Sequence, residues 1–283
     1  MQVGKRCLSA GPSCWCLLAL AFMALSAGAQ TSAPNEWTWI GGNSTLLPIN
    51  GAPSNVGWPG IYGTLGVPAV TNTPGGRDSA ATWTDQSGNL WLFGGLGYDS
   101  AGNVGDLNNL WEFNTSTQEW TWIGGSNSLP IPQIETGQPG VYGTLGVAAV
   151  GNVPGGRTNS VTWTDKNGNL WLFGGQGYAT IESLTGNTSF NDLWEFNPST
   201  KEWAWMSGDN QTGIADWGQS GVYGTLGKPA ARNVPGGRAS AVSWIDGDGN
   251  LWLFGGAGMI PATIFGNLIF PPANGPGWVE VAR

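Results

Sequence analysis

Three arginines occupy the same place in a repeated motif. Each follows the residues PGG, which gives Arg77, Arg157 and Arg238. A guanidinium group is a planar fork of five N–H donors that matches carboxylates and phosphates. Two interpretations follow: the arginines bind an anion or a carboxylate ligand, or each makes an internal ion pair or caps backbone carbonyls. Three identical copies at equivalent places favour the internal role.

Three tyrosines form a second repeated set of candidate binding residues. The motif YGTLG contributes Tyr62, Tyr142 and Tyr223, in segments rich in glycine and proline. An exposed tyrosine ring stacks on sugars or on peptide rings, whereas a buried one anchors its own loop and uses its hydroxyl as a polar handle. Both roles remain open from the sequence, and anchoring is the simpler one.

The groups most often used in catalysis and metal binding are missing. The chain has no histidine, and its three cysteines, Cys7, Cys14 and Cys16, all lie near the N-terminus. The commonest general base and metal ligand are therefore absent. The stretch DGDGN at 246–250 resembles part of a calcium loop, but such a loop needs more oxygen ligands, and the equivalents DQSGN and DKNGN lack its second carboxylate. We expect a turn there, and neither a cofactor nor a metal.

The N-terminus has the pattern of a secretory signal peptide. A basic start, MQVGKR, precedes the apolar run CLLALAFMAL and the small residues SAGAQ. We expect residues 1–29 to be removed, and the remainder, 30–283, to be secreted or periplasmic. The apolar run is too short to span a bilayer well, so no membrane anchor is predicted. Without Lys5 and Arg6, 8 basic residues stand against 18 acidic ones. That charge excludes nucleic acid as an expected partner.

These candidate residues are positioned by a repeat of about 80 residues. The octapeptide GNLWLFGG occurs at 88–95, 168–175 and 249–256. Each complete copy contains four aromatic and β-branched segments separated by turn residues, of which the first set is SAATWTD, LWLFGG, NLWEFN and EWTWIGG. No amphipathic helical period follows residue 30. The sequence predicts an all-β protein built from four-stranded antiparallel units.

The units are expected to stack on one another. LWLF is apolar without alternation, which suits a strand that is packed on both faces, and the double glycine that follows permits close approach of a neighbouring backbone. A single four-stranded unit cannot bury both faces alone. Stacked units of this kind are the blades of a β-propeller.

The residues resemble the kelch repeat. The signature is Gly94-Gly95 followed by Phe113 and Trp120, and it recurs as Gly174-Gly175, Phe196 and Trp203. This resemblance implies a β-propeller, usually of six or seven blades. In kelch propellers that bind acidic peptides, arginines near this position do the binding, which implies the same for Arg77, Arg157 and Arg238.

The chain departs from that family in the number of blades. We predict a partial propeller with blades at about 77–125, 157–208 and 238–283, in which the tail from Leu268 to Trp278 forms a worn third and fourth strand. Residues 36–42 repeat EWTWIGG and are expected to be a lone fourth strand. Three blades are too few for a ring of usual curvature. The chain is therefore either a fragment of a longer propeller or a protein that associates with its own copies. Inserts between the blades are long enough to carry function or mobility.

The favoured function is a secreted, non-enzymatic binding module for a protein or a polysaccharide. Galactose-oxidase-like propellers use histidines and a cysteine-linked tyrosine, which this chain lacks after its leader. A carbohydrate-active enzyme that uses carboxylates is the alternative, beside a fragment with no independent activity. Catalysis normally breaks the symmetry of a repeat. A structural role is therefore favoured over a catalytic one for the acids that recur, which are Asp85, Asp165, Glu112 and Glu195.

Overall fold

The computed structural model describes residues 36–49, 52–130, 136–177, 188–210, 218–258, 264–265, 268–269 and 279–282. The chain divides into two compact units, Met1–Ile40 and Gly41–Arg283, and every strand lies in the second. The described residues are all-β and contain no helix. No candidate membrane-spanning helix is found among them.

The first two blades are four-stranded antiparallel sheets, and their strands pair in chain order. Tight turns join the first strand to the second and the third to the fourth, as the turn residues between the aromatic segments predict. Tryptophans lie opposite each other in both sheets, Trp83 against Trp91 and Trp163 against Trp171. Blade 1 comprises β4 (Ala81–Thr84), β5 (Leu90–Phe93), β8 (Leu110–Asn114) and β9 (Glu119–Gly124), and blade 2 comprises β12 (Val161–Thr164), β13 (Leu170–Phe173), β16 (Leu193–Asn197) and β17 (Glu202–Ser207).

Smaller sheets continue each blade beyond its double glycine. In each repeat the arginine of the PGGR motif begins a short strand that pairs with the segment following Gly-Gly. These strands are β3 (Arg77–Asp78), β6 (Leu96–Tyr98), β7 (Val104–Asp106) and β10 (Thr136–Gly137) in one sheet, β11 (Arg157–Thr158), β14 (Gln176–Gly177) and β15 (Thr188–Ser189) in another, and β18 (Arg238–Ala239) with β21 (Ala257–Gly258) in the third. All pairings are antiparallel except that of β10 with β7, which is parallel.

The last strands of blade 3 differ from those predicted for the C-terminal segment. It has three strands among the described residues, β19 (Val242–Ile245), β20 (Leu251–Phe254) and β24 (Val279–Ala282), in that order. The expected third strand at Leu268 instead belongs to β23 (Leu268–Ile269), which pairs with β22 (Ile264–Phe265). The N–H and C=O groups along the open edge of β20 need a backbone partner. The strand β24 pairs with that edge in antiparallel fashion, with Val279 opposite Phe254.

The lone strand expected at 36–42 does not form. Residues 36–40 have no regular secondary structure, and 41–42 lie in a bend. The segment repeats the sequence of β9, but no strand among the described residues precedes it in the way that β8 precedes β9, and a strand is held by its backbone partner. The first strand pair after it is β1 (Leu47–Ile49) with β2 (Ala52–Val56).

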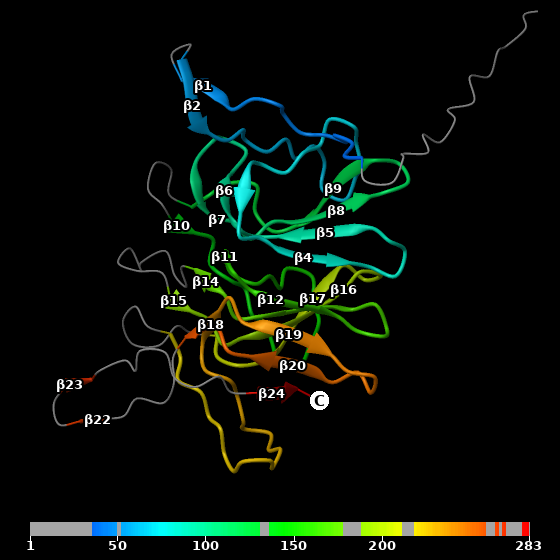
Figure 1. Ribbon diagram of the computed structural model, residues 1–283. Coiled ribbons are helices and arrows are strands. Elements are labelled where there is room, and N and C mark those ends of the chain that lie inside the picture. The colour runs from blue at the N-terminus through cyan, green and yellow to red at the C-terminus, as the bar shows by residue number, and fades with distance from the viewer. Residues whose placement is uncertain are drawn as a thin grey trace, which may run out of the picture. The chain divides into compact units, whose positions relative to one another are not determined.

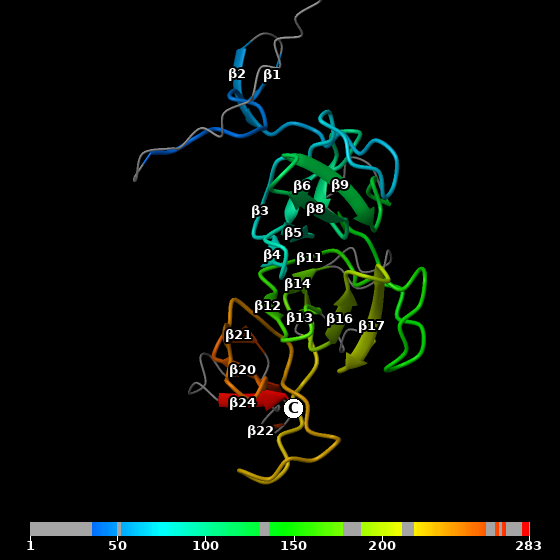
Figure 2. The ribbon, with the colours of Figure 1, turned by 90° about the vertical axis from the view of Figure 1, so that its right-hand side faces the viewer.

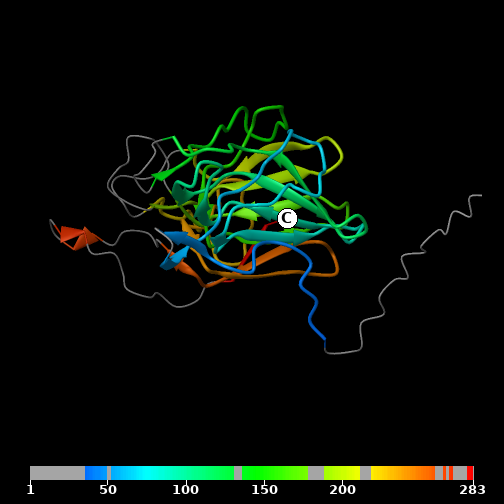
Figure 3. The same cartoon turned by 90° about the horizontal axis from the view of Figure 1, so that it is seen from above.

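The blades follow one another face to face, so that β4, β12 and β19 lie side by side (Figures 1 and 2). Seen from above, the strands of successive blades overlie one another (Figure 3). We call the face of a blade that meets the next blade its leading face, and the opposite face its trailing face. The leading face of blade 1 carries Ala81, Trp83, Trp91 and Phe93, and it packs on the trailing face of blade 2, which carries Leu170, Leu172, Phe196 and Trp203.

The same interface is built a second time between blades 2 and 3. Val161, Trp163 and Phe173 pack on Leu251 and Leu253. Burial of these large apolar side chains between neighbouring blades is a main source of stability, since each is worth about 1.5–3 kcal/mol when fully buried. The prediction of stacked antiparallel blades is confirmed.

The double glycine allows neighbouring blades to approach. Gly94 has φ +67°, and a Cβ there would lie 2.7 Å from the carbonyl oxygen of Arg157 in the next blade. Gly174 repeats this contact with the carbonyl oxygen of Arg238 at 2.5 Å. The following glycine donates its N–H to the same oxygen, from Gly95 to Arg157 and from Gly175 to Arg238, each at 2.8 Å. The repeated GNLWLFGG therefore encodes a blade and its contact with the next one.

Candidate interaction surface

The repeated aspartates hold the hairpins of the blades. Oδ1 of Asp85 accepts the backbone N–H groups of Ser87 and Asn89 at 2.8 and 2.9 Å, and its Oδ2 accepts the indole N–H of Trp91 at 2.9 Å. Asp165 and Asp246 repeat this arrangement. Hydrogen bonds, first from the Asn250 side chain, lower the pKa of Asp246. DGDGN is a turn, and the described residues contain no cluster of three or more metal-ligating side chains.

The repeated glutamates lie close to these hairpins. Glu112 accepts a hydrogen bond from the Asn89 amide at 3.0 Å, and Glu195 accepts one from Asn169 at 2.6 Å. Burial raises the pKa of both glutamates, and the charge of the neighbouring aspartate, Asp85 or Asp165, raises it further. Both glutamates accept a hydrogen bond from the asparagine at the equivalent hairpin position, which is consistent with a structural role.

The three arginines share one backbone geometry. In each, Nε donates to the glycine carbonyl two residues earlier, at 2.9–3.0 Å. Nη1 donates to the carbonyl of the first glycine of the double glycine, 17 residues later, also at 2.9–3.0 Å. Each arginine therefore ties the start of its blade to the end of the LWLF strand, which is the carbonyl-capping role.

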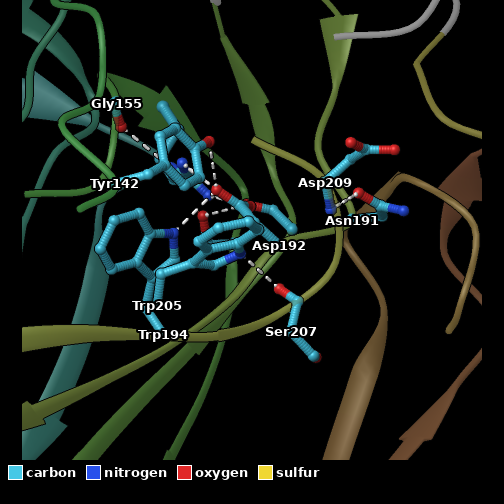
Figure 4. A network of polar contacts seen from close by, with 11 residues as sticks. Tyr142, Gly155, Asn191, Asp192, Trp194, Trp205, Ser207 and Asp209 are labelled. Carbon is cyan, nitrogen blue, oxygen red and sulfur yellow. Dashed lines mark hydrogen bonds and ion pairs between the residues drawn. The ribbon is translucent and has the colours of Figure 1, made fainter. Parts of the chain in front are cut away.

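Blade 2 adds an ion pair to this geometry, and Figure 4 shows its carboxylate, Asp192, among Tyr142 and Trp194. Arg157 binds Asp192 through Nη1 at 2.7 Å and Nη2 at 2.8 Å, and both side chains are fully buried. Oδ2 of Asp192 also accepts the Tyr142 hydroxyl at 2.7 Å and the indole N–H of Trp194 at 2.8 Å. Burial would lower the pKa of Arg157, but the Asp192 carboxylate outweighs it and the pKa is raised. Burial and the same carboxylate raise the pKa of Tyr142 far above its usual range.

Blade 1 carries an amide where blade 2 carries the carboxylate. Arg77 Nη1 donates to Oδ1 of Asn109 at 2.6 Å, and Nδ2 of Asn109 donates to the Tyr62 hydroxyl at 2.8 Å. Nη2 of Arg77 is buried and has no hydrogen-bond partner among the described residues. Burial lowers the pKa of Arg77. The cation of blade 1 thus lacks the carboxylate that compensates Arg157.

In blade 3 the arginine and the tyrosine of the repeat are in direct contact. Nη2 of Arg238 donates to the Tyr223 hydroxyl at 3.1 Å. Each tyrosine is thus brought to the arginine of its own repeat, directly in blade 3 and through the side chain at 109 or 192 in the other two. Tyr62 and Tyr142 also pack their rings against two tryptophans of their own blade, with centroids 4.8–5.3 Å apart. These contacts anchor the loops on their blades.

The loops anchored by these tyrosines expose aliphatic side chains. The first loop is held on β9 by a hydrogen bond from Gly66 N to Trp122 O at 2.8 Å and by the Asn72 amide on Trp120 O at 2.9 Å. The second is held on β17 in the same way by Gly146 and Asn152. We call the exposed aliphatic residues of these two loops the loop ridge: Ile61, Leu65, Val67 and Val70, and Val141, Leu145, Val147 and Val150.

The third loop departs from the ridge pattern. It exposes Val222 and Leu226, but Lys228 stands where the other loops have Val67 and Val147, and Arg232 is exposed beside it. Figure 2 shows the first two loops, cyan and green, beside β9 and β17. Two copies of the surface are therefore apolar, and the third is cationic.

The sequence carries a signal for the ridge. The leucine of YGTLG recurs as faithfully as the tyrosine, and the valines that follow it recur in the first two copies, although these residues lie in a glycine-rich loop where no packing period demands them. Leucine and valine in such a loop are usually assigned to a core. Only the structure shows that the tyrosine faces inward and the aliphatic residues face solvent.

Comparison with known proteins gives a distant match. No protein-family model matches the chain, and no curated protein matches it. Among solved structures, the structure of YjhT is similar, with 18% sequence identity and a TM-score of 0.35. The match covers 67% of this chain and 62% of that one. The chain thus spans less than two thirds of the length of that structure.

Proposed function

We propose that the chain is a non-enzymatic, kelch-type interaction module that binds a protein partner through the loop ridge. The observation that supports this most directly is the exposure of Val70 and Val150, 83% and 91%, at equivalent places in two loops with identical anchors. Contiguous exposed apolar side chains mark interaction sites more often than chance. Two copies of one apolar surface offer a partner two equivalent contacts.

The loops are ordered before a partner arrives. Their backbone is fixed by the tyrosine, the asparagine amide and the hydrogen bonds to the outer strand, so binding would not have to order it. Preorganisation of this kind saves much of the conformational entropy that association otherwise costs. An aliphatic surface without exposed rings favours a protein partner over a polysaccharide.

The polar candidates support a scaffold role. The guanidinium groups of Arg157 and Arg238 and the hydroxyls of their tyrosines make hydrogen bonds inside the blades, and the repeated acidic residues make hydrogen bonds at the hairpins. A reaction centre would need such groups at a surface that a substrate reaches. We extend the proposal to location: residues 1–29 direct the chain out of the cytoplasm, so that the ridge meets secreted or periplasmic partners.

A peptide selection tests the proposal. A phage-displayed peptide library is panned on the purified chain and counter-screened on a glycan array. We expect apolar peptides whose binding depends little on salt and is lost in the double variant Val70→Asp, Val150→Asp. The matched control, Ser116→Asp with Ser199→Asp, adds the same two charges at exposed hairpin tips of the same two blades and should bind as the unaltered chain does. Binding that survives the ridge variant, or turnover of a glycan, would overturn the proposal.

A further inference from the structure

The leading face of blade 3 is built like the two buried leading faces but is open to solvent. Trp83 and Trp163 are 5% and 7% exposed against the next blade, whereas the equivalent Trp244 is 54% exposed. Val242 and Phe254 are likewise exposed where Val161 and Phe173 are buried. Gly255 has the positive φ of Gly94 and Gly174, but no atom of the described residues lies within 4 Å of the position of its Cβ. This surface has the features of a blade interface without its partner.

The trailing face of blade 1 is the complementary open surface. Leu90 is 43% exposed, whereas the equivalent Leu170 and Leu251 are 0% and 6% exposed beneath the preceding blade. A hollow of about 450 Å³ opens on this sheet and is lined by Thr82, Trp83, Thr84, Leu90, Trp91, Leu92 and Trp120. In blades 2 and 3 the preceding blade fills the equivalent space.

We propose that the leading face of blade 3 docks on the trailing face of blade 1 in a second copy of the chain. The two interfaces inside the molecule specify what that contact would contain. Trp83 donates its indole N–H to the carbonyl oxygen of Trp171 at 3.0 Å, and Trp163 donates to the equivalent oxygen of Trp252 at 3.3 Å. Trp163 also lies 2.9 Å from the carbonyl oxygen of Trp244. By the same rule, Trp244 donates to the carbonyl oxygen of Trp91 of the second copy.

The polar contacts of the repeat extend in the same way. Thr162 and Thr164 donate their hydroxyls to the carbonyls of Thr82 and Thr84 in the preceding blade, at 3.1 and 3.2 Å. The second copy offers Thr82 and Thr84 themselves, which are exposed, to the carbonyls of Ser243 and Ile245. Asn159 N–H binds Ser79 O, and Ser240 N–H binds Asn159 O, both at 2.9 Å. In the proposed dimer, the next hydrogen bond of this series runs from the backbone N–H of Ser79 in the second copy to the carbonyl oxygen of Ser240.

A contact between different faces has a defined geometry. Head-to-tail interfaces close into a ring when the rotation permits and otherwise grow into open filaments. Two copies supply six blades, within the range of four to eight that propellers use. The second copy is favoured as the occupant because its blade 1 carries Leu90 and Leu92. These are the equivalents of the leucines of blades 2 and 3 on which the leading faces of blades 1 and 2 already pack within the chain. We therefore infer a closed dimer.

Sedimentation velocity on the purified chain over a range of concentrations tests the inference. We expect twice the monomer mass for the unaltered chain. Trp244→Glu and Leu90→Glu, one on each face, should both be monomeric with unchanged circular dichroism. Val242→Glu is a second leading-face variant in case Trp244→Glu fails to fold. Leu226 lies in the third loop, outside both faces, and is 93% exposed, so Leu226→Glu should remain dimeric.

Mixing the two monomeric variants tests the head-to-tail arrangement. Each retains one intact face, so the mixture should recover a one-to-one dimer that neither variant forms alone. A chain that is monomeric at every concentration, a Trp244→Glu variant that still dimerises, a mixture that does not associate, or open assemblies larger than a dimer would each overturn the inference. The ridge variant Val70→Asp, Val150→Asp should still dimerise, so failure of the proposed function and failure of this inference are distinguishable.

Discussion

The exchange of Asp192 and Asn109 between blades 1 and 2 tests how the buried arginines are compensated. Asp192→Asn gives blade 2 the side chain that blade 1 carries naturally. The amide retains an acceptor for Nη1 of Arg157 and can donate to Tyr142, as Asn109 does to Tyr62. What is lost is the negative charge beside a guanidinium that is 1% exposed, and the acceptor for its Nη2.

The magnitude follows from the burial of the pair. Removing one partner of a buried ion pair costs about 3–5 kcal/mol, and the lower end applies because several hydrogen bonds survive. For a chain of this size, about 1 kcal/mol lowers Tm by about 2–4 °C. We therefore expect Asp192→Asn to lower Tm by about 6–12 °C.

The reverse change, Asn109→Asp in blade 1, should stabilise the folded chain. Asn109→Asp gives Arg77 a carboxylate and its Nη2 an acceptor, in a geometry that blade 2 already realises. Hydrogen bonds to charged groups contribute about 1.5–3 kcal/mol. Part of this is offset, because the Asn109 amide donates to Ser126 O at 3.3 Å and a carboxylate cannot. A net gain of about 1 kcal/mol is expected.

Urea unfolding followed by tryptophan fluorescence measures both variants, with differential scanning calorimetry as a second readout. The opposite signs are the essential result. An Asp192→Asn variant as stable as the unaltered chain, or an Asn109→Asp variant that is as destabilised as Asp192→Asn, would refute the claim that the carboxylate compensates a buried cation.

Three further predictions concern the blade interfaces and the buried acids. Trp83→Phe should cost about 1 kcal/mol or more, from a lost hydrogen bond and lost contact, whereas Trp244→Phe should leave the unfolding free energy of the monomer unchanged by urea titration. In the monomeric Leu90→Glu background, Gly94→Ala should destabilise more than Gly255→Ala: both glycines have positive φ, but of these two only Gly94 would bring a Cβ onto a carbonyl of the described residues in the same chain. Equal losses in calorimetry would contradict this. Burial, with Asp85, raises the pKa of Glu112, so the folded chain binds a proton more tightly than the unfolded chain and stability falls as pH rises through the shifted pKa. Glu112→Gln should flatten that decline in urea titrations from about pH 4 to about pH 7.

Most of the blade architecture could be predicted from repeated local signals. Aromatic and β-branched segments, turn residues and double glycines each specify one part of a blade, and they agree in the first two repeats. Blade 3 was predicted less well because its last strands lack these signals. Leu268 has the spacing of a third strand, yet it pairs with β22, since hydrogen bonding along the β20 edge is satisfied by β24.

The candidate site could be predicted only in part. Spacing placed Arg157 and Tyr142 at equivalent points of each repeat, but spacing cannot show which way a side chain faces. The partner of Arg157 is Asp192, 35 residues away, and the sequence offered no reason to choose it from other acids. The difference between Asp192 and Asn109 is a single substitution whose meaning depends on burial. Exposure of the loop ridge likewise depends on the tyrosine beneath it.

Chemical accessibility of the arginines tests most directly the claim that the repeated polar residues build the scaffold and leave apolar surfaces for contact. The native chain is treated with phenylglyoxal, and modified arginines are located by mass spectrometry over time. The structure predicts rapid modification of exposed Arg232 and protection of Arg157 and Arg238, which are 1% and 5% exposed. Modification of Arg157 and Arg238 as fast as that of Arg232, in a chain that remains folded, would contradict the account.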